Sequence, residues 1–193
     1  MAKVNLEKIK NIIIFFCKNT WQGNLSKTKI LKLLFLCDFK HVEKYGRPIT
    51  NDIYYHLPHG PIPSLIKSFL DNLNKKDDYD LGKELKSFQN TFTTEIRRTK
   101  KGNFDIITLK GDIQFNDEFF SVSELEIMKN ICKKYCKTSA KELKRITHMH
   151  KGYKNTSDNE VIPYIYGIKN KADKEYFEFW EKEKQELDLI LHK

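Results

Sequence analysis

The chain lacks any hydrophobic run long enough to cross a bilayer. The longest apolar run near its amino-terminal end, residues 12–17, has only six residues, whereas a membrane-spanning helix needs about 20. The sequence around this run has no small-residue cleavage site of the kind that ends a secretory signal peptide. We therefore expect a cytoplasmic protein without a membrane partner.

Cysteine is also scarce, with four residues in 193. A reducing compartment would not keep a disulfide, and a free Cys in an apolar helical pattern behaves as a small hydrophobe. Cys132 and Cys136 precede His148 and His150 in the order C-x3-C…H-x-H. Zinc sites favour histidines three to five residues apart. Core packing is the better interpretation of these four residues, and we predict no metal and no cofactor.

A recognisable nucleophile motif is missing as well. His56 and His59 could serve acid–base chemistry, but neither Ser nor Cys stands beside them in such a motif. Cys37 lies in the middle of a predicted buried helix, where a thiol is usually inert. We therefore predict that the protein is not an enzyme.

Charge is present in excess of one sign, with 35 Lys and Arg against 26 Asp and Glu, a net charge of +9. The lysines are scattered, which favours a solvated surface of mixed charge over a dedicated site for polyanions. A nucleic-acid-binding regulator stays open as the alternative, because the helices predicted over residues 124–136 and 139–149 have helix-turn-helix spacing. The side chains that would then line the exposed side of the second helix are Lys141, Lys144, Arg145 and His148.

Residues 26–45 predict the central element of the fold. Ser26 can cap this helix, Gly46 ends it, and Pro48 prevents its continuation. The helix is apolar on most sides and should therefore be buried. Its predicted polar stripe consists of Lys29, Lys32, Lys40 and Glu43.

The remaining patterns predict shorter elements around this helix. They are a first helix capped by Asn5, an extended segment over 47–55, a rigid turn at 59–63, a third helix with Pro63 at its first position, a hairpin of 92–98 with 104–109, capping boxes at 123–126 and 139–142, and a last helix over about 172–191. We predict an α+β fold, predominantly helical, with a buried central helix packed by flanking helices and a small antiparallel β-hairpin or sheet. It would form a single domain, 1–193, that could divide into sub-lobes 1–80 and 120–193 joined by the hairpin region 90–110.

Asp38 is the most suggestive single residue, because it shares a helix face with apolar side chains such as Leu34 and Val42. A buried carboxylate must be hydrogen-bonded or paired. We expect a structural lock in which Asp38 binds Arg47 or the turn at residues 59–61.

Two groups of motifs carry a resemblance to a known family. They are Lys32-Leu33-Leu34-Phe35, Asp38, residues 45–49 and the turn 59–63 in the first half, and residues 123–126, 139–143, 147–148, 153, 156 and 161–164 in the second. In this order and spacing the chain resembles the Panacea domain of SocA-like antitoxins. The resemblance implies a cognate toxin protein as partner, and for some members the delivery of that toxin to a cytosolic AAA+ protease.

The segment 53–63 is the predicted partner-binding surface. Interfaces draw energy from a few rigid aromatic anchors, and prolines lose little entropy on binding. The candidate residues are Tyr54, Tyr55, His56, His59, Gly60 and Pro61. Strand alternation puts Tyr54 and Tyr55 on opposite faces, so we expect the outward-facing tyrosine and His59 to contact the toxin. The alternative, that the whole turn is core architecture, stays open.

Overall fold

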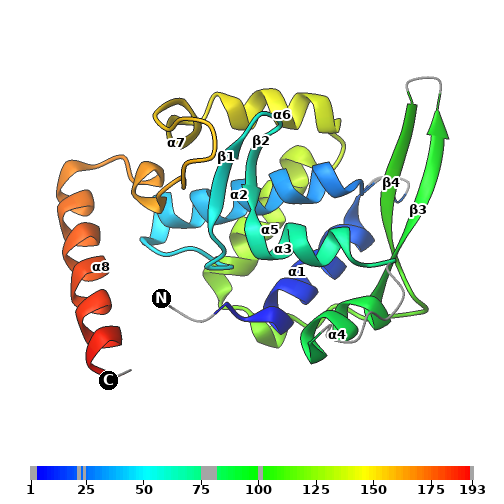
Figure 1. Ribbon diagram of the computed structural model, residues 1–193, viewed down its shortest axis with the longest axis horizontal. Helices are drawn as coiled ribbons and strands as arrows, with labels where there is room; N and C mark the ends of the chain where they lie inside the picture. Colours follow the sequence, from blue (N-terminus) through cyan, green and yellow to red (C-terminus); the bar gives the residue numbers. More distant parts are fainter. Residues whose placement is uncertain (1–3, 21–22, 24, 75–81, 100–101, 192–193) are drawn as a thin grey trace.

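The computed structural model describes residues 4–20, 23, 25–74, 82–99 and 102–191, without the side chains of 99, 180 and 184–191. The helix α2, Lys27–Tyr45, runs through the middle of the molecule (Figure 1). Ser26 caps it by accepting a hydrogen bond from Lys29 N, and Gly46 ends it in the left-handed conformation. Packed against α2 are α5 (Val122–Tyr135), α6 (Ala140–His148), β2 (Gly60–Pro63) and the short 3-10 helix η3 (Tyr164–Gly167).

The fold is predominantly helical with two small antiparallel sheets, which confirms the predicted α+β class with its buried central helix. The other helices are α1 (Leu6–Asn19), α3 (Ser64–Asp71), α4 (Lys83–Thr91), α7 (Lys151–Lys154), α8 (Lys171–Leu191) and the 3-10 helix η2 (Asp117–Phe119). The hairpin β3–β4 consists of Phe92–Thr99 and Gly102–Leu109. It lies at the end of the molecule opposite to α8 (Figure 1). Helix α4 has a short polar sequence and was not predicted.

The extended segment predicted over 47–55 is wrong over most of its length. The strand β1 covers only Tyr54–Leu57 and pairs with β2, Tyr54 opposite Pro63 and Leu57 opposite Gly60. Upstream of β1, the backbone N–H groups of Ile49 and Thr50 turn inward to Asp38, and Asn51 has a positive φ of 58°. Residues 49–53 therefore form a wrapped turn instead of a strand.

Helix starts differ from the predicted ones by one or two residues. Pro63 is the last residue of β2, and α3 is capped by Asp52, whose carboxylate accepts hydrogen bonds from Leu65 N and Ile66 N. The capping box of α5 joins Ser121 and Glu124, two residues before the predicted box. Ser139 does cap α6, but the Glu142 side chain binds Arg145 instead of reaching back to the cap.

One large buried cluster draws its side chains from α1, α2, α3, α4, α5 and α6. A second, smaller cluster is mostly aromatic and consists of Phe35, Phe39, Tyr54 and Ile162. Helix α8 stands apart and packs against η3 (Figure 1). Within the described ranges, no helix is long and apolar enough to cross a membrane.

Candidate functional site

Helix α2 carries polar side chains into the core, which the predicted polar stripe did not anticipate. Lys40 is exposed and pairs with Glu43 at 2.9 Å, as a surface stripe would. Lys29 and Lys32 are buried instead, with 5% and 0% of their surface exposed. The Lys29 ammonium group donates to the Cys136 carbonyl oxygen at 2.6 Å and joins α2 to the end of α5. Lys29 therefore anchors the carboxyl end of α5 inside the protein.

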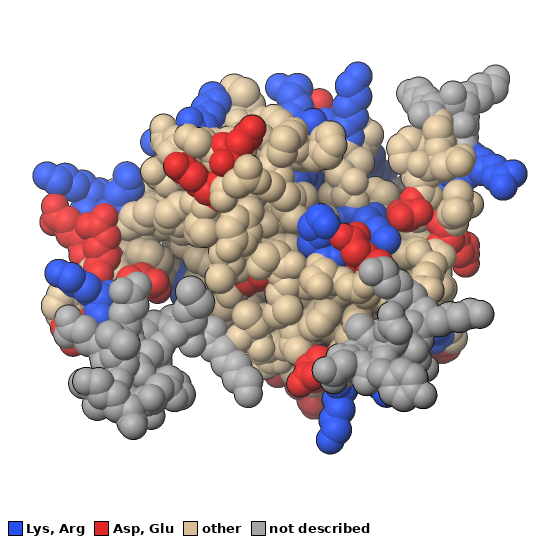
Figure 2. Space-filling view, viewed as in Figure 1, with Lys and Arg blue, Asp and Glu red and all other residues tan. Residues whose placement is uncertain are grey.

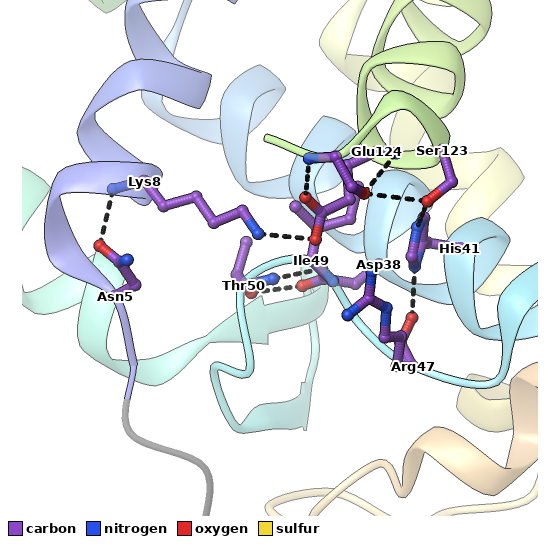
Figure 3. Close-up of polar contacts among 10 residues, drawn as sticks. Asn5, Lys8, Asp38, His41, Arg47, Ile49, Thr50, Ser123 and Glu124 are labelled. Carbon is purple, nitrogen blue, oxygen red and sulfur yellow. Dashed lines mark hydrogen bonds and ion pairs between the residues drawn. The ribbon is translucent and has the colours of Figure 1, made fainter. Parts of the chain in front are cut away.

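Asp38 is fully buried and collects hydrogen bonds from the wrapped turn (Figure 3). Oδ1 accepts from Ile49 N and Thr50 N, both at 2.8 Å, and Oδ2 accepts from the hydroxyl groups of Thr50 and Tyr54. Burial raises the pKa of Asp38, and these donors oppose that shift because they stabilise the carboxylate. Asp38 thus locks α2 to residues 49–54.

The predicted partners of Asp38 were wrong. Among the described residues, neither the Arg47 side chain nor the turn 59–61 donates to its carboxylate. Arg47 uses its carbonyl oxygen, which accepts a hydrogen bond from His41 Nδ1 at 2.6 Å. Gly46 reverses the chain directly after α2, and this reversal brings the Ile49 and Thr50 N–H groups to the Asp38 carboxylate.

A second polar network ties α1 and α2 to the start of α5 (Figure 3). Lys8 Nζ lies 2.6 Å from Glu124 Oε1, and the other carboxylate oxygen accepts from Ser121 N. Burial alone would raise the pKa of Glu124, but the hydrogen bonds from Lys8 and Ser121 bring it below its usual value. The Ser123 hydroxyl group lies 3.0 Å from Ser121 Oγ and 3.1 Å from His41 Nε2.

The hairpin β1–β2 is fastened to α2 along its inner face. Tyr54 is 1% exposed and donates to Asp38, while Tyr55 points to the other face and is half-buried beside Val161. Lys32 Nζ donates to the Pro61 carbonyl oxygen at 2.8 Å. Burial, together with the nearby Lys144, lowers the pKa of Lys32 from 10.5 to about 7.

Gly60 brings the tip of this hairpin into close contact with α2 and α6. Its φ of +94° is open to glycine and strained for other residues. A Cβ atom at this position would lie 3.0 Å from both His148 Nε2 and Lys32 Nζ. The turn therefore sits directly on these two side chains.

Three stacked rings pack the hairpin against α6 and α7. Tyr153 of α7 lies between His56 and His148, with ring centroids 3.6 Å and 4.2 Å away. Its hydroxyl group donates to the Leu57 carbonyl oxygen, and His56 Nδ1 lies 3.0 Å from the Thr156 hydroxyl group. The stack joins β1 to α6 and α7 and gives the hairpin a fixed shape.

The six predicted partner-binding residues divide between core and surface. Tyr54, Gly60 and Pro61 are buried, Tyr55 and His56 are half-buried, and His59 is exposed. His59 Nδ1 lies 3.2 Å from Lys144 Nζ. The side chains that this hairpin offers to a partner are therefore His59 and the exposed part of Tyr55, because the His56 side chain is only 12% exposed.

The residues of the alternative DNA-binding face do not lie together on one free surface. Lys144 and His148 face the hairpin, and Arg145 binds Glu142 through both Nε and Nη2. Lys141 is exposed. In the same view as Figure 1, Lys and Arg side chains line the upper edge of the molecule over α6 (Figure 2).

Cys136 and His150 of the C-x3-C…H-x-H pattern have different neighbours. Cys136 lies beside Lys29 and Thr20, while His150 caps α7 and packs against the rings of Phe35 and Phe39. Burial lowers the pKa of His150 to about 4. The described part of the chain contains no group of three or more His, Cys, Asp or Glu side chains that could hold a metal ion.

Sequence reasoning missed the roles of Lys32 and Tyr153. The sequence signal for Lys32 is a lysine on an otherwise apolar helical face. The predicted polar stripe placed this lysine on the surface instead. Tyr153 follows Gly152, where a Cβ atom would lie only 2.7 Å from Ile162. The close approach at this glycine is what places the tyrosine ring between the two histidines.

Comparison with known proteins gave one match. The family model described as antitoxin SocA-like, Panacea domain, matches residues 30–154, more than half of the chain. This range begins in α2 and ends in α7, so it includes the Asp38 lock, the hairpin β1–β2 and the ring stack. Searches of curated proteins and of solved structures found no match.

Proposed function

Because the chain belongs to the family of SocA-like antitoxins with a Panacea domain, we propose that it neutralises a toxin protein by binding it directly, without catalysis. The proposed contact surface is the exposed part of the hairpin β1–β2, with His59 and Tyr55 at its centre. The antitoxin role comes with the family, whereas the surface is assigned from geometry.

The observation that carries this surface is the rigidity of the hairpin. Asp38 holds Tyr54, Lys32 holds Pro61, and Tyr153 holds Leu57, so the strands are fixed on three sides. A surface that is already ordered loses little conformational entropy when a partner binds. Rings with a polar edge, such as His and Tyr, also supply contact area together with hydrogen bonds.

The protonation state of the Cys37 thiol supports a binding function over Cys–His catalysis. Burial raises the pKa of Cys37 well above its usual value, and the neighbouring Asp38 and Cys136 add to this. The nucleophilic form of cysteine is the thiolate. Cys37 is therefore held in its unreactive form.

The test is co-expression with the product of the adjacent gene, the toxin that the family pattern implies. Wild-type protein should restore growth and co-purify with the toxin. The double variant Tyr55→Ala/His59→Ala should lose both properties and keep nearly the same melting temperature. The matched control, Ile96→Ala/Phe104→Ala, removes two exposed side chains from the other hairpin and should neutralise the toxin normally. Neutralisation by the first variant, or its loss in the control, would place the contact surface elsewhere.

In its finer form the proposal has the antitoxin deliver the toxin to a cytosolic AAA+ protease. A pulse-chase measurement of toxin half-life separates the two modes. A shorter half-life in the presence of the antitoxin supports delivery. Restored growth with an unchanged half-life means that binding alone blocks the toxin.

A further inference from the structure

Basic side chains converge on the tip of the hairpin β1–β2 from three elements. They are Lys32 of α2, His56 and His59 of the hairpin, and Lys144 and His148 of α6. In the described ranges, the acidic side chain paired with this group is Asp158, whose carboxylate lies 3.5 Å from His56 Nε2 at the far side of the ring stack. The cluster thus has more hydrogen-bond donors than acceptors, and the charge that it carries is positive.

The inner pair of this cluster, Lys32 and His148, is incompletely satisfied. An ammonium group has three N–H donors, and the described residues provide Lys32 with one acceptor, the Pro61 carbonyl oxygen. His148 Nε2 is buried without a hydrogen-bond partner. Leaving a buried polar group unsatisfied usually costs about 1–3 kcal/mol, so native proteins keep such atoms where they serve a purpose.

The outer pair, His59 and Lys144, is open to solvent at the tip. The 3.2 Å contact places the lysine N–H on His59 Nδ1, so the neutral imidazole carries its proton on Nε2. The His59 Nε2–H points away from the lysine, and the two remaining N–H groups of Lys144 can donate to an incoming acceptor. Lys144 is therefore arranged to bind an anion from solvent.

We propose that this cluster, which we call the hairpin-tip site, binds a carboxylate of an Asp or Glu side chain on the toxin. Lys144 donates to its oxygens, and the Lys32 ammonium group lies beneath the turn. This inference rests on the proposed function and specifies the chemistry of the partner at its contact surface. A carboxylate that replaces water here gains charge-assisted hydrogen bonds, which are stronger than neutral ones.

The geometry favours a protein carboxylate over the phosphates of a nucleic acid. Binding along a polyanion relies on several Lys and Arg side chains that track a row of phosphates. Of the other cations on α6, Arg145 is already held by Glu142 at 2.7 Å, whereas Lys141 is exposed. The aromatic stack beside the hairpin-tip site offers an apolar border that suits a protein side chain.

Two variants of equal charge on one helix test the site against general electrostatics. Lys144→Glu places a negative charge at the hairpin-tip site, and Lys141→Glu makes the same change one turn away on the exposed side of α6. By calorimetry with the toxin, Lys144→Glu should weaken binding by about tenfold or more, and Lys141→Glu by about twofold or less. Replacing each surface Asp and Glu of the toxin by Lys should then identify one position that restores binding to Lys144→Glu. Equal losses in the two variants, or no restoring position, would overturn the proposal.

A probe experiment separates failure of the site from failure of the antitoxin role. Hexaglutamate should shift the NMR signals of the His59 and His148 rings in wild-type protein and in Lys141→Glu, and leave them in place in Lys144→Glu. This outcome would support the site even if wild-type protein does not bind the toxin, in which case the proposed function alone would fail. Shifts caused by a 12-base-pair DNA duplex but not by hexaglutamate would overturn the carboxylate assignment in favour of phosphate.

Discussion

The two hairpins of this protein have the same antiparallel design and opposite relations to the core. In β1–β2 the strands have four residues, and every residue of β2 is buried. In β3–β4 they have eight, and Ile96 and Phe104 are 68% and 42% exposed. The shorter hairpin has fewer ladder hydrogen bonds of its own and is held by side chains from α2 and α7. Its fixed shape is therefore a product of tertiary contacts, which is the property a binding surface needs.

Replacing the buried carboxylate behind the short hairpin should have the largest effect. Asp38→Ala leaves the N–H groups of Ile49 and Thr50 and the Tyr54 hydroxyl group without their acceptor. We expect the free energy of unfolding to fall by about 3–5 kcal/mol. Chemical denaturation followed by circular dichroism measures it.

The control for this change is a carboxylate of the long hairpin. Asp105 is exposed and lies 3.3 Å from Lys27 Nζ, and an exposed ion pair is worth about 0–1 kcal/mol. Asp105→Ala should therefore have a small effect. Similar losses in the two variants would remove the contrast between the hairpins.

Lys32 should make the stability of the protein depend on pH in an unusual range. Its pKa is about 7 in the folded protein, whereas a solvated lysine of the unfolded chain has the ordinary value of 10.5, so the unfolded state binds more protons between these values. The free energy of unfolding should then rise with pH through this window. From pH 7 to 9.5, wild-type protein should gain about 3 kcal/mol relative to Lys32→Met. Parallel stability–pH curves for the two proteins would show that Lys32 is solvated.

A pair of glycine substitutions compares the two hairpin tips directly. Gly60 and Gly102 have φ values of +94° and +121°, so a side chain is strained at both. At Gly60 the added Cβ would also press on His148 and Lys32. At Gly102 the added Cβ would meet no heavy atom of the described structure within 4 Å apart from its chain neighbours. Gly60→Ala should therefore destabilise the protein by about 1 kcal/mol more than Gly102→Ala. A larger loss for Gly102→Ala would mean that the contacts beneath the short hairpin are loose.

The smallest effect is expected at the exposed apolar side chain of β3. Ile96→Thr keeps the β-branched shape and replaces a solvent-facing ethyl group with a hydroxyl group, so stability should change by about 0.5 kcal/mol or less. Thermal unfolding measures this change. A loss as large as that of Gly60→Ala would show that Ile96 is covered in solution.

Local signals in the sequence were sufficient for much of the fold. The ends of α2 follow from Ser26 and Gly46, and the pairing of 92–98 with 104–109 follows from β-branched alternation. The start of α5 was missed because Ser121-x-x-Glu124 and Ser123-x-x-Glu126 overlap as capping boxes. Lys8 and His41 decide between them, and both belong to other helices.

The site was predictable in part. That Asp38 needs partners follows from its place on an apolar face, but the partners depend on how the chain turns after Gly46. The surface assignment of Lys32 failed for a similar reason. A lysine in an apolar helix can reach solvent or an internal carbonyl group, and only the position of Pro61 selects the second. Tyr54 and Tyr55 were expected on opposite faces, and pairing with β2 placed Tyr54 inside.

The contact surface itself is tested most directly by hydrogen–deuterium exchange on wild-type antitoxin, free and bound to the product of the adjacent gene. Our account predicts that the toxin slows exchange at residues 55–60 and 144–156, which form the short hairpin and the elements stacked on it, while exchange in β3–β4 stays unchanged. Slower exchange in β3–β4 or α8, with residues 55–60 and 144–156 unaffected, would contradict it.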